Sequence, residues 1–202
     1  MTTSQAMPVV EALQVLADLC CDGQIVVTNQ GSARIWPKLR SELTGRERAL
    51  DFHYNPSTMG GAIPLALGLA LAQPARDVVA VSGDGSLLMS LGSLVTVIGA
   101  GATNLTIVLL DNGIYEVTGG QQTPASSAVD YCGLARAAGF PSVGNFEQLE
   151  HWSASAAGAL SQPGPRFLRL AVGTSPEEHL RFPTPPIAEQ LAQLQRALRV
   201  EI

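Results

Sequence analysis

Two short apolar runs, each ended by polar residues that lie beside glycine, constrain the fold of this chain more than any other feature. Residues 78–81 are followed by Gly-Asp-Gly, and residues 105–110 are followed by Asp-Asn-Gly. Continuous β-branched and apolar runs are typical of parallel strands that are covered on both faces. The composition and length of the segment 86–100 between them favour a helix. The pattern therefore predicts a β-α-β unit with a right-handed crossover.

The same alternation of strand and helix continues along the rest of the chain. It indicates an α/β fold with a central, mainly parallel sheet flanked by helices. Because the 202 residues show no repeat and no second composition class, we expect one domain over residues 1–202, with 174–202 as a C-terminal arm and helix. The proline-rich segment 176–186 is predicted to be irregular. Apolar periodicity predicts further helices at about 8–20, 33–43, 60–73, 129–138, 146–160 and 187–198, and strands at about 25–27, 49–53 and 167–172.

Charge and cysteine content argue against several classes of function. The formal net charge is −5 without a long basic run, which argues against binding to nucleic acid. The three cysteines form no C-x-x-C pair, so neither a structural zinc nor an iron–sulfur cluster is supported. Their odd number fits a reducing cytoplasm. The longest apolar run, 60–72, is too short to cross a membrane, and the first residues lack a signal-peptide pattern. We therefore expect a cytoplasmic protein without a membrane partner.

Asp84 and Asn112 are candidate metal ligands, because each follows one of the two apolar strands. The carboxyl ends of parallel strands meet at one rim of a sheet, where ligands bind. Carboxylate and amide oxygens suit Mg²⁺, which takes its remaining ligands from phosphate and water. Gly83 and Gly85 allow a tight turn and close approach of an anion, and Ser86 opens a helix whose N-terminus favours an anion. Either Gly-Asp-Gly or Asp-Asn-Gly alone would be an ordinary turn sequence.

Residues 83–112 resemble the signature of thiamine-diphosphate-dependent enzymes, Gly-Asp-Gly followed at an interval by Asn-Asn, with Asp111 in place of the first asparagine. The resemblance implies the three-layer thiamine-diphosphate-binding fold, with thiamine diphosphate and Mg²⁺ as cofactors. It also implies that the side chains of Asp84 and Asn112 and the backbone carbonyl of Ile114 bind the metal. The residues that it implies along the diphosphate are Gly83, Gly85, Ser86, Tyr115 and Val117.

Two upstream segments extend this resemblance. Residues 57–60 resemble the segment that holds the aminopyrimidine ring, with Met59 wedged beneath the cofactor and backbone groups of Ser57 and Met59 bonded to the ring. Without the resemblance, Met59 would be a core residue. Residues 29–32 resemble a loop that offers a hydroxyl to the diphosphate, which makes Ser32 the candidate; an ordinary strand-to-helix turn is the alternative.

The run 109–121, LLDNGIYEVTGGQ, is most similar to sulfopyruvate decarboxylase β subunits and to the C-terminal half of phosphonopyruvate decarboxylases. This implies a subunit of a heteromeric thiamine-diphosphate-dependent carboxy-lyase that acts on a small 2-oxo acid. Arg34 and His53 are weaker candidates for the substrate pocket, since a surface arginine and a structural histidine are the simpler interpretations. Glu116 falls on the diphosphate side of the site.

The glutamate that activates the cofactor lies on a separate pyrimidine-binding domain in this superfamily. The resemblance therefore implies an α subunit that supplies the glutamate, active sites between the two chains, and self-association within a hetero-oligomer. No residue of this chain is therefore assigned a catalytic role. Three alternatives stay open: a carboligase of the acetolactate-synthase type, a ferredoxin-linked 2-oxo-acid oxidoreductase subunit, and a non-catalytic scaffold subunit.

Overall fold

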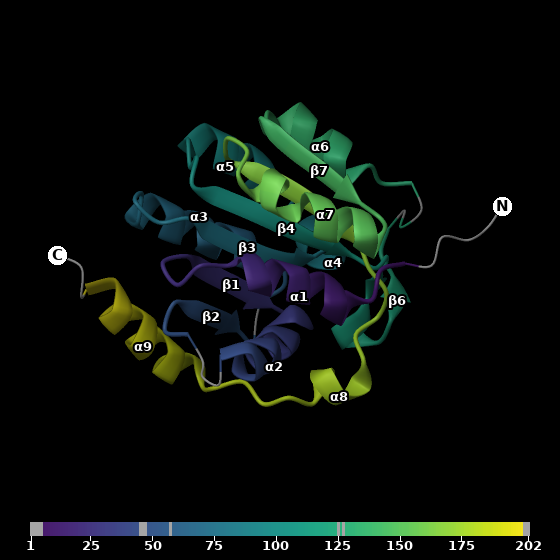
Figure 1. The fold of residues 1–202 in the computed structure, drawn as a ribbon. Helices are drawn as coiled ribbons and strands as arrows, with labels where there is room; N and C mark the ends of the chain where they lie inside the picture. The colour runs from purple at the N-terminus through teal and green to yellow at the C-terminus, as the bar shows by residue number, and fades with distance from the viewer. Residues whose placement is uncertain (1–5, 45–47, 57, 125, 127, 200–202) are drawn as a thin grey trace.

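A parallel sheet forms the centre of the molecule (Figure 1). The computed structural model describes residues 6–44, 48–56, 58–124, 126 and 128–199. The strand order is β2-β1-β3-β4-β8-β7, and every neighbouring pair in this sheet is parallel. This sheet with helices on both faces confirms the predicted fold class. The strands are β1 (Ile25–Asn29), β2 (Asp51–Tyr54), β3 (Val78–Gly83), β4 (Leu105–Asp111), β7 (Ser142–Phe146) and β8 (Arg166–Ala171).

Two helical layers cover the sheet, and the strands alternate between them with a period of two residues. Val79 and Val81 of β3 pack with the first layer, whereas Val78 and Ala80 pack with the second. Both faces of the central strands are therefore buried, which explains their continuous apolar sequence. The first layer contains α1 (Val9–Leu19), α2 (Ser32–Thr44) and α7 (Leu149–Leu160), and the second contains α3 (Ala62–Ala72), α5 (Ser93–Ala100) and α6 (Tyr131–Ala138).

The helix predicted at 86–100 is divided in two. The first part, α4 (Asp84–Leu88), begins within the Gly-Asp-Gly sequence, and α5 begins after the turn at 89–92. Within that turn Ser90 donates its N–H to Leu87 and accepts the N–H of Ser93. Serine and glycine are weaker helix formers than alanine or leucine, so the helix breaks where Ser90 and Gly92 lie close together.

The sequence did not predict four small elements, namely β5, β6, β7 and α8. The edge strand β7 has the sequence SVGNF, which contains no continuous apolar run. A short hairpin joins β5 (Ile114–Tyr115) to β6 (Gln121–Gln122) in the glycine-rich loop, and α8 (Glu177–Leu180) lies in the segment predicted to be irregular. Among the described residues, no helix has the length and apolar character needed to span a membrane.

The C-terminal segment runs from the end of β8 to the opposite edge of the sheet (Figure 1). After α8 the chain passes α2 and enters α9 (Ile187–Arg199), which packs on the edge strand β2. The Gln190 amide accepts the backbone N–H of His53 at 2.7 Å and donates to its carbonyl at 3.1 Å. Asn55 also donates to the Thr184 hydroxyl at 3.1 Å. The arm is therefore fixed at its distal end to the strand that precedes the Met59 segment.

Candidate functional site

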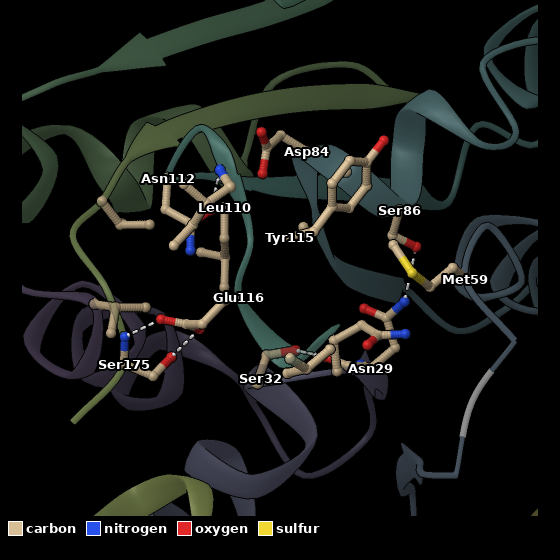
Figure 2. Close-up of a pocket in the computed structure, with 18 residues that line it drawn as sticks. Asn29, Ser32, Met59, Asp84, Ser86, Leu110, Asn112, Tyr115, Glu116 and Ser175 are labelled. Atoms are coloured by element: carbon tan, nitrogen blue, oxygen red, sulfur yellow. Dashed lines mark hydrogen bonds between the residues drawn. The ribbon is translucent and has the colours of Figure 1, made fainter. Parts of the chain in front are cut away.

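One pocket opens at the carboxyl ends of β1, β3 and β4, and the C-terminal arm forms part of its wall (Figure 2). The pocket brings together every predicted metal-binding and cofactor-binding residue except Ser57, which lies outside the described residues. Residues from segments more than 100 positions apart therefore share one cavity. Its lining residues are Val9, Asn29, Gln30, Gly31, Ser32, Met59, Gly83, Asp84, Gly85, Ser86, Leu110, Asn112, Ile114, Tyr115, Glu116, Val117, Val172 and Ser175.

Asp84 is a buried carboxylate at the first position of α4, with 1 % of its surface exposed. Its Oδ2 accepts a hydrogen bond from the Thr123 hydroxyl at 3.0 Å. Burial raises the pKa of Asp84, the hydrogen bond from Thr123 opposes that rise, and the charge of Asp111 adds to it. Within the described part of the chain, no Lys or Arg forms an ion pair with Asp84. A buried anion without a counter-charge suits a bound cation.

Asn112 lies in the turn after β4 and lines the same pocket as Asp84 (Figure 2). Its Oδ1 accepts the backbone N–H of Ile114 at 3.1 Å, and Gly113 adopts a φ of 72° that allows the turn. The amide oxygen keeps a second lone pair for a ligand. The described residues contain no group of three or more His, Cys, Asp or Glu side chains suited to a metal. A cation here would therefore need Asn112, backbone oxygen, phosphate and water, as Mg²⁺ does.

The Ser86 hydroxyl joins three segments at the base of the pocket. It accepts hydrogen bonds from the Asn29 side-chain amide at 3.1 Å and from the backbone N–H of Gly60 at 2.9 Å. The other side-chain atom of Asn29, the buried Oδ1, has no hydrogen-bond partner among the described residues. An unsatisfied buried acceptor that lines a pocket fits a polar ligand. The sequence singled out Ser32 in this loop and missed Asn29.

Ser32 lines the pocket, but its hydroxyl also holds the turn that begins α2. The Ser32 hydroxyl donates to the carbonyl of Asn29 at 2.7 Å and accepts the Asn29 N–H at 3.2 Å. Ser32 thus lies at the predicted site and also stabilises a strand-to-helix turn. Donation of the same hydroxyl to a diphosphate stays a prediction, and it would require release of the bond to Asn29.

Tyr115 approaches Gly85 so closely that any side chain at this position would have to displace the Tyr115 ring. A Cβ added to Gly85 would lie 2.5 Å from two carbons of the Tyr115 ring and 3.3 Å from the Thr123 methyl. The first turn of α4 therefore packs directly on the hairpin that carries Ile114 and Tyr115. Close packing by the protein itself, in addition to the expected approach of an anion, explains this glycine.

Glu116 connects the pocket to the C-terminal arm, a contact that the sequence did not predict. Its carboxylate accepts the backbone N–H of Ser175 at 2.5 Å and the Ser175 hydroxyl at 2.7 Å (Figure 2). Gly31 lies against both groups, since a Cβ there would be 3.1 Å from the Ser175 hydroxyl and 3.2 Å from Glu116. The loops after β1 and β4 and the arm after β8 therefore meet at one point of the wall.

Asp111, which replaces the first asparagine of the signature, forms a buried ion pair with Arg169. The Arg169 Nε and an Nη atom each lie 2.6 Å from Asp111 Oδ2. Arg169 also donates to Asn145 at 2.7 Å and Glu147 at 3.2 Å. A carboxylate at this position therefore has a structural partner on the neighbouring strand β8.

The weaker substrate candidates lie outside the pocket lining. His53 is buried on β2, and its Nδ1 shares a hydrogen bond of 3.0 Å with the Thr28 hydroxyl. Burial lowers the pKa of His53 to about 4, so the ring is neutral near pH 7. Arg34 lies beside the arm and donates to the Phe182 carbonyl at 3.5 Å. These contacts favour the structural interpretation of both residues.

The fold and the pocket together define a class: a parallel α/β domain with a pocket at the carboxyl ends of its strands, where ligands bind in such sheets. Residues 30–170 match the family model described as thiamine pyrophosphate enzyme, C-terminal TPP binding domain. The chain belongs to this family, which confirms the resemblance found in residues 83–112.

Curated relatives and a solved structure agree with this assignment. Phosphonopyruvate decarboxylase of Streptomyces viridochromogenes is 40 % identical over 159 residues, which are 79 % of this chain and 38 % of that protein. Sulfopyruvate decarboxylase subunit beta of Methanococcus maripaludis is 32 % identical over 158 residues, 78 % of this chain and 80 % of that subunit. A structure described as a thiamin diphosphate-dependent enzyme from Mycobacterium smegmatis superposes with a TM-score of 0.68 at 27 % identity, covering 85 % of this chain and 32 % of that one. The chain thus spans well under half of the phosphonopyruvate decarboxylase that it matches.

Proposed function

We propose that this chain is the diphosphate- and Mg²⁺-binding subunit of a thiamine-diphosphate-dependent 2-oxo-acid decarboxylase. The observation that carries the proposal is Asp84, a buried carboxylate that pairs with no Lys or Arg among the described residues and lines the same pocket as Asn112. Asp84 is the first residue of α4, so a cation bound to it would lie beside a helix N-terminus, which favours a phosphate. The decarboxylases among the relatives support the type of reaction.

In this proposal the residues of the pocket divide between metal, diphosphate and pyrimidine. The side chains of Asp84 and Asn112 and the carbonyl of Ile114 would hold Mg²⁺. Met59 and Ser57 would hold the aminopyrimidine ring. When bound, thiamine diphosphate supplies an electron sink for the loss of CO₂ from a 2-oxo acid. The residues proposed along the diphosphate are Ser32, Gly83, Gly85, Ser86, Tyr115 and Val117.

The structure supports the need for a glutamate from another chain. Glu116 is the glutamate among the described lining residues, and both oxygens of its carboxylate accept hydrogen bonds from Ser175. That engagement leaves it poorly suited to activate a cofactor by proton transfer. We therefore assign the activating glutamate to a separate pyrimidine-binding α subunit. The name "subunit beta" of the Methanococcus maripaludis relative supports a partner of this kind.

An uncharged surface next to the pocket supports the same partner. Residues 54–75 and 85–110 contain no Asp, Glu, Lys or Arg. These stretches include α3, α5 and the turn between α4 and α5, where Leu71, Val95 and Met89 are 52 %, 63 % and 56 % exposed. Depletion of charge with exposed apolar side chains is typical of a surface that another protein covers. We place the α subunit, and self-association within the assembly, on this face.

The proposal is tested on the complex purified from its native cells. We expect a second chain, thiamine diphosphate and Mg²⁺ in stoichiometric amounts, and CO₂ release from one member of a panel of 2-oxo acids that includes sulfonates and phosphonates. Asp84→Ala should lose the metal and the activity together. A coupled hydroxyketone as product would indicate a carboligase instead. Unchanged partner binding without cofactor or activity would indicate a scaffold, and a co-purifying iron–sulfur chain would indicate an oxidoreductase.

A further inference from the structure

Thr123 contacts both segments that carry the proposed metal ligands. It follows β6 directly and is 2 % exposed. Its hydroxyl donates to Asp84 Oδ2 at 3.0 Å, and its backbone N–H donates to the carbonyl of Gly113 at 2.9 Å. Gly113 lies between Asn112 and Ile114 in the turn after β4. One residue thus joins the Gly-Asp-Gly segment to the Asp-Asn-Gly turn.

We propose that Thr123 is a positioning residue of the cation site: its hydroxyl fixes the orientation of the Asp84 carboxylate. This inference rests on the proposed function, because it takes Asp84 to be a cation ligand. Thr123 itself does not touch the metal in this proposal. Its contribution is to hold one carboxylate oxygen in place, so that the group meets the cation already oriented.

The surroundings of Asp84 explain why one neutral hydroxyl matters. The carboxylate is almost completely removed from water, and Asp111 nearby adds like charge. The Thr123 hydroxyl lies 3.0 Å from Asp84 Oδ2 and donates a hydrogen bond to it inside this buried site. Without the hydroxyl, the buried carboxylate would lose a stabilising donor and gain freedom to rotate. Both effects weaken the binding of a cation.

Packing fixes the Thr123 side chain in the required orientation. Its methyl group lies against Gly85, where a Cβ would approach it to 3.3 Å. The antiparallel pairs Ile114–Gln122 and Tyr115–Gln121 hold the two ends of the hairpin together just before Thr123. The loop that carries the proposed carbonyl ligand and the carboxylate ligand are therefore fixed to one another through this threonine.

Isosteric variants separate the hydroxyl from the shape of the side chain. Thr123→Val keeps the branched side chain and removes the donor, whereas Thr123→Ser keeps the donor. The probe is Mn²⁺ in the presence of thiamine diphosphate, with binding measured by electron paramagnetic resonance on the purified complex. We expect Thr123→Val to bind Mn²⁺ about 10- to 100-fold more weakly, and Thr123→Ser to stay within about threefold of wild type. In activity assays, a high metal concentration should restore most of the lost rate to Thr123→Val.

A matched control tests whether the loss of any buried threonine hydroxyl weakens metal binding. Thr28→Val removes a buried hydroxyl that contacts His53 instead of Asp84, so its Mn²⁺ affinity should equal that of wild type. Equal Mn²⁺ affinity in wild type and Thr123→Val would overturn the inference. If wild type itself bound neither Mn²⁺ nor thiamine diphosphate, the proposed function would fail instead. Should Thr123→Val not fold, equal weakening in Thr123→Ser and Thr123→Ala would overturn the role of the hydroxyl.

Discussion

Glu116 and Ser175 join the pocket to the C-terminal arm through two hydrogen bonds, although 59 positions separate them in the chain. The carboxylate accepts both the backbone N–H and the hydroxyl of Ser175, and Gly31 leaves just enough space for this contact. The arm therefore belongs to the wall of the proposed cofactor site. The segment predicted as a C-terminal arm thus helps to shape the pocket.

Removal of this contact should weaken cofactor binding by loosening the wall. A hydrogen bond to a charged group contributes about 1.5–3 kcal/mol, so Glu116→Ala should lower the affinity for thiamine diphosphate about tenfold. Ser175→Ala keeps the backbone bond and should lower it less. Calorimetric titration with thiamine diphosphate and Mg²⁺ measures the affinity, and limited proteolysis reports release of the arm. The control is Glu177→Ala in α8, where the residue is exposed. Tighter binding by Glu116→Ala would mean that the carboxylate acts by repelling the diphosphate.

Asp84→Asn should stabilise the apoprotein and weaken its binding of the cation. The substitution keeps the size of the side chain and an oxygen that can accept from Thr123, but it removes a buried charge. We expect the Tm of the apoprotein to rise by about 2–4 °C, corresponding to about 1 kcal/mol. Wild type should gain about 2.7 kcal/mol from cofactor and Mg²⁺ at 100 times Kd, and the variant should lose this gain. Thermal unfolding with and without ligands measures both effects. A variant that the ligands still stabilise fully would exclude Asp84 as a metal ligand.

Gly85→Ala should destabilise the chain even without a cofactor. The new Cβ would lie 2.5 Å from the Tyr115 ring, so the hairpin would have to move. Overpacking of this kind costs about 1–3 kcal/mol, which urea unfolding of the apoprotein measures. Gly68→Ala in α3 is the matched control, because a Cβ there meets nothing within 4 Å; it should stabilise the helix by up to about 1 kcal/mol. Equal stability of wild type and Gly85→Ala would contradict the packing role of Tyr115.

The buried His53 should make the folded chain less stable in mild acid. Burial lowers the pKa of His53 to about 4 from an ordinary value of 6.5, so between these values the unfolded chain binds more protons than the folded chain. The free energy of unfolding should therefore decrease as the pH falls through this window, by up to roughly 3 kcal/mol from this residue. His53→Asn, which can keep a side-chain contact with Thr28, should lack that part of the pH dependence. Urea unfolding at several pH values compares the two slopes; parallel slopes would show that His53 protonates as readily in the folded chain.

The sequence could predict the central part of this structure because local pattern and long-range packing agree there. Strands β3 and β4 are buried on both faces, so their apolar runs are unbroken, and the polar residues after them mark the pocket. The edge strand β7 was missed because its sequence SVGNF is polar and partly exposed. The break between α4 and α5 was missed because the apolar residues on both sides of Ser90 and Gly92 continue a helical pattern.

Several residue roles in the site could not be predicted from the sequence because they depend on contacts between segments that are distant in the chain. The role of Ser175 depends on where the arm passes after β8, and nothing local to residue 175 indicates it. The same holds for Arg169, because its ion pair with Asp111 depends on the position of β8 beside β4. Thr123 lies in a glycine-rich loop, and nothing local to it indicates that its side chain is buried. The roles assigned to the pocket residues toward a cofactor stay predictions.

The Gln190 side chain has a consequence for how these molecules associate. By bonding both backbone groups of His53, it takes the place that a further strand would occupy beside β2. An open edge is a template on which sheets of neighbouring molecules can add strand by strand. Because Gln190 of α9 occupies the backbone groups of His53, β2 is hindered from pairing with a strand of another molecule. Loss of Gln190 would free that edge, and aggregation of the partly opened chain, rather than a change in chemistry, would be the first symptom.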